Sequence, residues 1–320
     1  MPTGTVTDDG LSGTSGTWAR LRRRPGRRMQ VAALLAPAML LYLVFVLVPV
    51  GLAAWYSLFK WNGIGPLEEF VGLGNYRRAL GDDVFRGAVL HNAIFVVLSL
   101  VVQFPLTLGL ALLLDRRIPG RPVLRLVLFT PYVLSEVITA IAWLLILQPD
   151  GLLDAALDAL GLGGLIRLWL ADQDLVLYTL FGVATWKYLG FGIILFLAGL
   201  RNVPEEVKEA ATLDGASAGQ IVRHVTVPLL GPTIRIWAFL SVIGSLQLFD
   251  LVWIMTEGGP SNASTTMATY LIDHGFQRYE FGFGSAAATL LFLISFVVAL
   301  AYQRWVLRRD LIGVPAGRVG

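Results

Sequence analysis

Six long apolar segments constrain this chain more than any other feature of its sequence. A helix needs about 20 apolar residues to cross the hydrocarbon core of a bilayer, and each segment is at least that long. The composition agrees, because 56% of the 320 residues are hydrophobic, only 15% are charged, and the mean hydropathy is +0.69. We therefore predict an all-α integral membrane protein with six transmembrane helices, at 30–58, 87–114, 122–148, 175–200, 229–256 and 284–307.

Several prolines lie within or near these segments, and four of them are expected to bend a span. Proline removes a backbone hydrogen bond, but neighbouring helices can satisfy the carbonyl that it frees. Kinks are therefore predicted at Pro37, Pro49, Pro105 and Pro131.

The residue types exclude several kinds of chemistry. There is no cysteine, which rules out disulfides, cysteine metal clusters and thiol nucleophiles. The three histidines are scattered and form no H-E-x-x-H pair, so no metal site is predicted. A nucleotide-binding P-loop needs Gly-Lys-Ser/Thr, whereas Lys60, Lys187 and Lys208 follow Phe, Trp and Val. We therefore predict no catalytic residue and no cofactor in this chain, and any ATP must be bound by another chain.

Lysine and arginine residues orient the chain, because cytoplasmic loops accumulate them. Eighteen of the 25 lie before the first segment, around the second and fourth connections, or near the end of the chain, whereas six lie in the opposite loops. Both termini and the stretch between the fourth and fifth segments are therefore predicted to be cytoplasmic. The formal charge of +3 is then a topology signal, with a smaller contribution from anionic lipid, and does not indicate nucleic acid.

The arginine-rich start could instead be a secretory or twin-arginine signal. A signal core runs 7–15 residues, and this first apolar segment is about twice as long, so a retained span is favoured. The organisation expected is a disordered basic tail at 1–29, a six-helix membrane domain at 30–310, and a cytoplasmic tail at 311–320.

A polar stretch at 201–228 interrupts this apolar sequence. Pro204 suits a first helical position, and the two glutamates that follow favour the positive end of a helix dipole. Gly215 is placed where a helix ends in a left-handed turn, and Ser217 can cap a second helix. The stretch is therefore predicted to be a helical hairpin that is continuous with the fifth transmembrane helix.

Three interpretations of this hairpin compete. It could be an amphipathic loop on the membrane, although its alanine-rich apolar face anchors weakly. A DNA-binding helix-turn-helix has a similar rhythm, but this stretch is tethered at both ends and carries few cations. The third interpretation is a surface presented to a cytoplasmic partner, whose small residues allow close approach.

The motif in the hairpin resembles the E-A-A–x3–G–x9–I–x–L–P signature of permease subunits of bacterial binding-protein-dependent ABC importers. The matching residues are Glu209, Ala210, Ala211, Gly215, Val225, Val227 and Pro228, with valines in place of the usual Ile and Leu. The resemblance implies a type I importer permease fold in which this hairpin is the coupling helix. It would dock into a cleft of the ATP-binding subunit through Glu209, Ala210, Ala211, Asp214, Gly215 and Ala216.

Three further stretches are similar to the carbohydrate-uptake permeases, a group that includes the maltose and glycerol-phosphate types. They are FVGLGNYRRAL, RPVLRLVLFTPYVLSEVITAIAWLLIL and LFDLVWIMTEGGP, starting at Phe70, Arg121 and Leu248. Glu257 stands where many relatives have glycine. The chain lacks the extra helices and external domain of the maltose-type first subunit, so it resembles the simpler six-span members.

Polar and aromatic residues within the spans are the candidates for a substrate path. Hydrogen-bonding groups beside aromatic faces suit an uncharged polyol, and Gln247, Phe249, Asp250 and Trp253 provide both on the fifth span. Weaker candidates are Trp186, Lys187 and Tyr188 on the fourth span and Glu136 on the third. The alternatives are that Phe249 and Trp253 only pack against lipid or a neighbouring helix, or that the ionisable groups of Glu136, Lys187 and Asp250 carry an ion-coupled transport cycle.

The connection at 256–265 is rich in turn-forming residues and could be a plain connector. The resemblance implies that Gly258, Gly259 and Pro260 face a docked binding protein. It also implies several partners: a second, homologous permease, two copies of an ABC ATPase that bind ATP and Mg, an extracytoplasmic solute-binding protein and a sugar. The expected location is the bacterial cytoplasmic membrane, with an ion-coupled transporter or a membrane scaffold as alternatives.

Overall fold

The computed structural model describes residues 27–67, 69–116 and 119–307, so most of the predicted N-terminal tail and the whole predicted tail at 311–320 lie outside the described residues. Two compact units divide the chain after Val50. The first contains α1 (Arg27–Tyr42), the π-helical turn η1 (Leu43–Leu47) and the first residues of α2 (Val48–Tyr56). The last three residues of the predicted tail, 27–29, are therefore helical.

The second unit starts with the rest of α2, which is followed by a short ribbon that the sequence did not predict. In it, β1 (Phe59–Lys60) pairs antiparallel with β2 (Glu69–Phe70). The helices that follow are α3 (Gly74–Gly81), α4 (Asp83–Leu98), α5 (Phe104–Asp115), α6 (Arg121–Val133), α7 (Glu136–Leu147), α8 (Leu152–Ala159), α9 (Val176–Leu200), α10 (Glu205–Leu213), α11 (Ala218–Ile221), α12 (Val227–Leu229), α13 (Gly231–Leu246), α14 (Asp250–Thr256), α15 (Met267–Ile272) and α16 (Phe281–Tyr302). A 3-10 turn, η3 (Gly163–Leu165), and four π-helical turns complete it: η2 (Ser99–Gln103), η4 (Val222–Thr226), η5 (Asp273–Gln277) and η6 (Gln303–Leu307).

Within the described residues, five helical stretches are long and apolar enough to cross a membrane. They are Val31–Tyr56, Asp83–Asp115, Val176–Leu200, Gly231–Thr256 and Phe281–Val306. The third predicted span, at 122–148, is not a straight helix, because α6 and α7 meet at an angle of 104°. The count reaches six only if this bent pair is one span.

Three of the π-helical turns end two residues before a proline: η1 before Pro49, η2 before Pro105 and η4 before Pro228. A proline ring presses on the carbonyl four residues earlier and cannot donate to it, and a widened turn relieves the clash. After η2, for example, the Phe104 N–H bonds the carbonyl of Ser99, five residues back. At Pro49 and Pro105 the predicted kink therefore coincides with a π turn.

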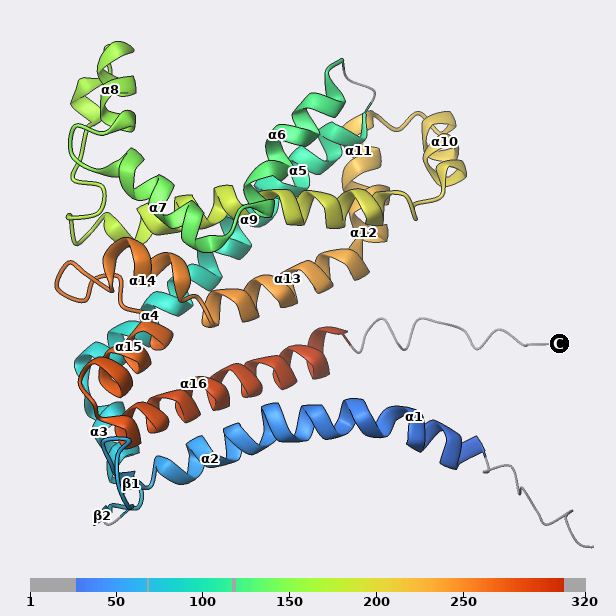
Figure 1. Ribbon diagram of the computed structural model, residues 1–320. Helices are drawn as coiled ribbons and strands as arrows, with labels where there is room; N and C mark the ends of the chain where they lie inside the picture. Colours follow the sequence, from blue (N-terminus) through green and yellow to red (C-terminus); the bar gives the residue numbers. More distant parts are fainter. Residues whose placement is uncertain (1–26, 68, 117–118, 308–320) are drawn as a thin grey trace, which may run out of the picture. The chain divides into compact units, whose positions relative to one another are not determined.

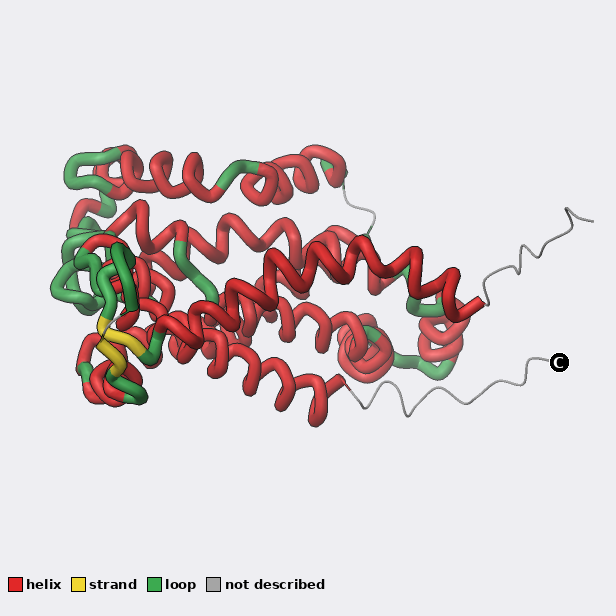
Figure 2. Tube along the Cα trace, turned by 60° about the horizontal axis from the view of Figure 1, so that its bottom comes forward, coloured by secondary structure: helices red, strands yellow, loops and turns green. Residues whose placement is uncertain are grey.

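The core of the second unit is organised around α9. Its first half packs with α7 and α14 in one apolar cluster, and its second half packs with α5 and α13 in another. A third cluster joins α3, α4, α13, α15 and α16. The long helices run in roughly the same direction, with the loops gathered at their ends (Figure 2).

Different elements lie at the two ends of this unit (Figure 1). One end carries β1, β2, α3, α8 and the loop after α14, and we call it the strand end. The other carries the start of α6 and the α10–α11 hairpin, and we call it the hairpin end. These names fix positions within the second unit alone.

Helices α6 and α9 approach each other closely at Gly190. A β-carbon added there would lie 2.5 Å from the carbonyl oxygen of Leu128 and 3.0 Å from the Cα of Phe129, both backbone atoms that cannot rotate away. We expect Gly190→Ala to push the helices apart and to destabilise the fold by about 1–3 kcal/mol. A lower Tm of the detergent-solubilised protein would show this.

Gly182 is the matched control, because it lies in the same helix and a β-carbon added to it would have nothing within 4 Å. Gly182→Ala should leave Tm unchanged or raise it slightly through helix propensity. Equal Tm values for the two variants would contradict the close approach at Gly190.

Candidate functional site

Two breaks in the helices shape the middle of the second unit. The first is the bend between α6 and α7, at Leu134 and Ser135. The second separates α13 from α14 at residues 247–249, within the predicted fifth span. Inside a membrane each break frees backbone groups that need new partners, and transporters often place their binding sites at such discontinuous helices.

Consecutive residues of α9 hold the two sides of the first break. The Lys187 ammonium donates to the carbonyl of Leu134, which ends α6, at 2.6 Å. The hydroxyl of Tyr188 donates to the carboxylate of Glu136, which begins α7. Ser135 caps α7 by accepting from the Ile138 N–H at 3.2 Å. The bend is therefore fixed by side chains and not left open.

Two buried side chains hold the second break. The Asn92 amide on α4 donates to the carbonyl of Ser245 at 2.7 Å and accepts from the Met267 N–H at 2.9 Å. The Thr266 hydroxyl donates to the carbonyl of Leu248 at 2.9 Å. Both Asn92 and Thr266 are 0% exposed, so these bonds replace water at the broken helix.

Both breaks open onto one cavity of about 410 Å³. Glu136 reaches it from the first break, and Gln247, Phe249 and Asp250 reach it from the second. These four residues were predicted for a substrate path from separate spans, and the fold brings them together. The size and the mixture of aromatic and polar groups are those of a small-molecule site.

The two predicted tryptophans do not line this cavity. Trp253 instead stacks on Phe249 with ring centroids 5.6 Å apart, and Trp186 packs edge-on against Trp143 at 5.4 Å. Both rings therefore contact other aromatic side chains of the protein.

Tyr188, a weaker candidate from the sequence, also lines the cavity, together with residues that the sequence did not single out. The polar ones are Ser99, Gln103, Thr185, Ser241 and Ser245, and the aromatic ones are Phe95, Tyr132, Phe181, Phe191 and Trp237. The presence of serine and glutamine within apolar spans was the sequence signal that could have identified the polar residues of this wall. Ser241 donates to Ser99 at 2.8 Å and Ser99 to Gln103 at 2.5 Å, so α13 and the π-helical turn η2 share one polar strip.

The predicted hairpin lies at the opposite end of α9 from α8. Helix α10 ends in a Schellman motif: Gly215 has φ +82°, its N–H bonds the carbonyl of Thr212, and the Ala216 N–H bonds that of Ala211. Ser217 and Gln220 form a capping box that starts α11. Pro204 occupies the N-cap with extended ψ, so the prediction that it is the first helical residue was off by one position.

The hairpin is exposed but firmly connected. No residue of α10 is buried, and Leu213 at its end is 90% exposed. The connecting residues Val203 and Leu230 are buried in the cluster around α5 and α9, at 6% and 1% exposure. Leu230 is also the single non-helical residue between α12 and α13, so the predicted continuity with the fifth span holds with one interruption.

The loop after α14 is compact. Glu257 and Gly258 both have positive φ, and a β-carbon on Gly258 would lie 2.6 Å from the Thr265 hydroxyl. Buried Ser264 closes the loop by donating to the carbonyl of Gly259 at 2.6 Å. The loop lies at the strand end (Figure 1), and its left-handed Glu257 occupies a conformation that glycine adopts more easily.

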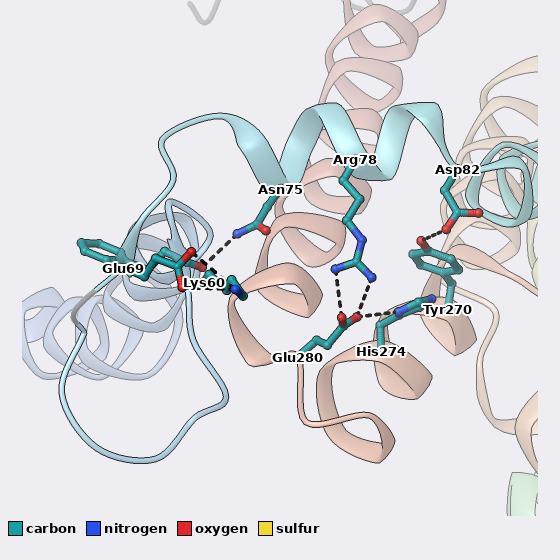
Figure 3. A network of polar contacts seen from close by, with 9 residues as sticks. Lys60, Glu69, Asn75, Arg78, Asp82, Tyr270, His274 and Glu280 are labelled. Atoms are coloured by element: carbon teal, nitrogen blue, oxygen red, sulfur yellow. Dashed lines mark hydrogen bonds and ion pairs between the residues drawn. The ribbon is translucent and has the colours of Figure 1, made fainter.

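A polar network ties the strand end together (Figure 3). Arg78 on α3 donates to both oxygens of Glu280 at 2.9 and 3.0 Å, and His274 lies 3.1 Å from the same carboxylate. Burial alone would raise the pKa of Glu280, but the bonds from Arg78 and His274 outweigh it and hold the pKa below its usual value. Tyr270 likewise donates to Asp82 at 2.8 Å, so α3, α15 and the start of α16 form one support.

Most of the chain matches a known protein family. Residues 103–309, which contain both breaks and the hairpin, match the family described as the inner membrane component of binding-protein-dependent transport systems. The chain belongs to this family. It is therefore a membrane permease component.

Several curated relatives match this permease over most of its length. A probable ABC transporter permease of Pyrococcus horikoshii is 34% identical over 85% of this chain and 93% of its own. A trehalose/maltose transport system permease of Thermococcus litoralis is 31% identical, covering 85% and 91%. A lactose transport system permease of Rhizobium radiobacter is also 31% identical, covering 86% and 92%.

A solved structure confirms the fold. It belongs to a bacterial ABC transporter involved in the import of the acidic polysaccharide alginate, and it matches with a TM-score of 0.77 over 88% of this chain and 96% of that one. The two sequences are 22% identical, so the match shows the type I permease fold alone.

Because Asn92 bonds the end of α13 at the second break and the start of α15, we expect its substitution to destabilise the protein. Asn92→Ala would leave the Ser245 carbonyl and the Met267 N–H without this partner, at about 1–3 kcal/mol for each buried group. We expect the free energy of unfolding to fall by at least about 2 kcal/mol, with a clear drop in Tm. Tryptophan fluorescence during heating measures the Tm. Asn202→Ala, at an exposed turn residue, is the control and should melt like the original protein. Identical melting of both variants would refute a structural role for Asn92.

Proposed function

We propose that this permease is one of two membrane subunits of an ATP-driven importer that translocates a sugar or oligosaccharide delivered by an extracytoplasmic binding protein. The cavity between the two helix breaks carries this proposal. Hydroxyl, amide and carboxylate groups beside aromatic rings can bind sugar hydroxyls and pack on a sugar ring. The maltose and lactose systems named for two relatives support the same substrate class.

The hairpin is proposed to bind a separate ABC ATPase subunit, which holds ATP and Mg. Glu209, Ala210, Ala211, Asp214, Gly215 and Ala216 would form its contact surface. The absence of any buried residue in α10 supports this role, because Leu213, an apolar residue left 90% exposed at the helix end, suits a partner's groove. One hairpin per chain also fits a second, homologous permease beside two ATPase copies.

The proposed orientation places the hairpin end and both termini in the cytoplasm of a bacterial cell. The strand end, with Gly258, Gly259 and Pro260, would then face the binding protein. The excess of lysine and arginine in the loops of the hairpin end supports this orientation. The membrane domain is proposed to extend over 30–310, between the two terminal tails.

Gentle detergent purification of the tagged chain tests the assembly. We expect an ATP-binding chain and a second permease to co-purify, and the complex to import maltose, lactose or diacetylchitobiose into proteoliposomes when ATP and the binding protein are supplied. Recovery of the chain alone would contradict the proposal. Uptake that persists without ATP hydrolysis and collapses with an ion gradient would indicate an ion-coupled transporter instead.

A substitution at Gly215 tests coupling through the hairpin. A β-carbon there has nothing within 4 Å, so Gly215→Leu adds bulk on the outer surface of the hairpin. We expect sugar uptake to fall at least about tenfold, about 1.4 kcal/mol, while ATP hydrolysis by the assembled complex continues. The quantity to measure is ATP hydrolysed per sugar imported.

Gly120 provides a closely matched control at the start of α6. Its φ of +75° is near that of Gly215, and the space around its β-carbon position is equally open. Gly120→Leu therefore carries the same left-handed strain, about 1–2 kcal/mol, without touching the hairpin. Normal uptake in Gly215→Leu, or equal loss in both variants, would remove the coupling role.

A further inference from the structure

The charges around the cavity are all of one sign. Its acidic side chains are the carboxyl groups of Glu136 and Asp250, one from each helix break. Its other polar side chains are neutral hydroxyls and amides, and no lysine, arginine or histidine lines it in the part of the chain that the structure describes. Any ligand in this cavity therefore meets a negative surface.

The nearest buried cation does not cancel this charge within the cavity. Lys187 is 3% exposed, lies outside the lining, and its ammonium donates to the Leu134 carbonyl at 2.6 Å. Glu136 interacts electrostatically with both Lys187 and Asp250, so this single ammonium faces a pair of carboxyl groups. Asp250 is exposed to the open space at the break.

The carboxylates act differently on neutral, cationic and anionic sugars. A neutral hydroxyl can donate to a carboxylate and form a charge-assisted hydrogen bond. An amino group adds an opposite charge, whereas a uronate or phosphate adds a like charge in a site of low dielectric, where repulsion is strong. Such repulsion is an effective way to reject a ligand of similar shape.

We propose that Glu136 and Asp250 form a charge filter that admits neutral and amino-bearing saccharides and rejects anionic ones. This inference rests on the proposed function of the cavity. It separates this permease from the solved importer of similar fold, which is involved in the import of an acidic polysaccharide, alginate. Asp250 is the residue that contributes most to the discrimination.

The absence of cysteine allows the charge to be measured without any sugar. A single cysteine introduced by Ser245→Cys would line the cavity, and it can be labelled with methanethiosulfonate reagents carrying either an ammonium or a sulfonate. We expect the cationic reagent to react at least about tenfold faster, relative to a free thiol, because of the local potential. Labelling is followed by the mass of this chain within the assembled complex.

Neutralising the carboxylates should remove this preference. The quantity compared is the labelling rate of the cationic reagent divided by that of the anionic reagent. In Asp250→Asn this ratio is expected to fall several-fold. In Glu136→Gln/Asp250→Asn it should come within about twofold of the ratio for a free thiol. A control cysteine from Ala218→Cys, exposed on the hairpin, should keep its own ratio in both backgrounds. A ratio near one in the unaltered cavity, or one that the neutral variants leave unchanged, would overturn the charge filter. If the double variant fails to assemble, the Asp250→Asn variant alone still tests the proposal.

Uptake then tests the consequence for sugars. Whichever of maltose, lactose and diacetylchitobiose is imported is compared with its C6-carboxylate form, with the same binding protein throughout. We expect Asp250→Asn to raise carboxylate uptake relative to neutral uptake by about tenfold, which corresponds to about 1.4 kcal/mol. An unchanged ratio would overturn the filter. Failure to import any of the three sugars would count against the proposed function, whereas the cysteine result would still report the charge of the cavity.

Discussion

Carbonyl groups freed inside a membrane have to find partners within the protein, and the structure of this permease depends on how three side chains provide them. Lys187 bonds the carbonyl at the end of α6, Asn92 bonds the end of α13, and Thr266 bonds Leu248 within the second break. Without such partners each break would cost several kcal/mol in hydrocarbon. With them, two interrupted helices can enclose a polar cavity in an otherwise apolar protein.

The same bonds link the cavity to the rest of the fold. Lys187 and Tyr188 belong to α9, whose halves lie in two different apolar clusters. Asn92 joins α4 to α13 and α15, and α15 in turn is held by the network around Arg78 and Glu280 at the strand end. The position of each cavity residue is therefore set by elements that are distant in sequence.

The sequence predicted those structural features that depend on residues close together in the chain. The apolar segments gave most of the spans, and the Gly215 and Ser217 signals gave the hairpin turn, because a left-handed glycine and a capping serine act over a few residues. A kink was predicted at Pro131, but not the 104° bend that follows it, because the carbonyl partner that permits the bend, Lys187, lies 53 positions from Leu134. Lys187 was considered as a carrier of ion coupling, but its bond makes it a support for the break. Gln247, Phe249 and Asp250 were identified by their chemistry, whereas Ser99, Gln103 and Ser241 reach the cavity through helix packing that no local pattern reports.

Helix α9 also has the geometry of a lever. Its 25 residues form an unbroken helix roughly 37 Å long. Near its middle, Lys187, Tyr188 and the close contact at Gly190 join it to α6 and α7. The arm from Lys187 to Leu200, beside the hairpin, is about 20 Å long, so a tilt of about 5° would move that end by about 2 Å and the opposite end in the other direction. Side chains beside the pivot would move only by tenths of an ångström. A small tilt of this helix would therefore move both of its ends while the groups that line the cavity keep nearly the same arrangement.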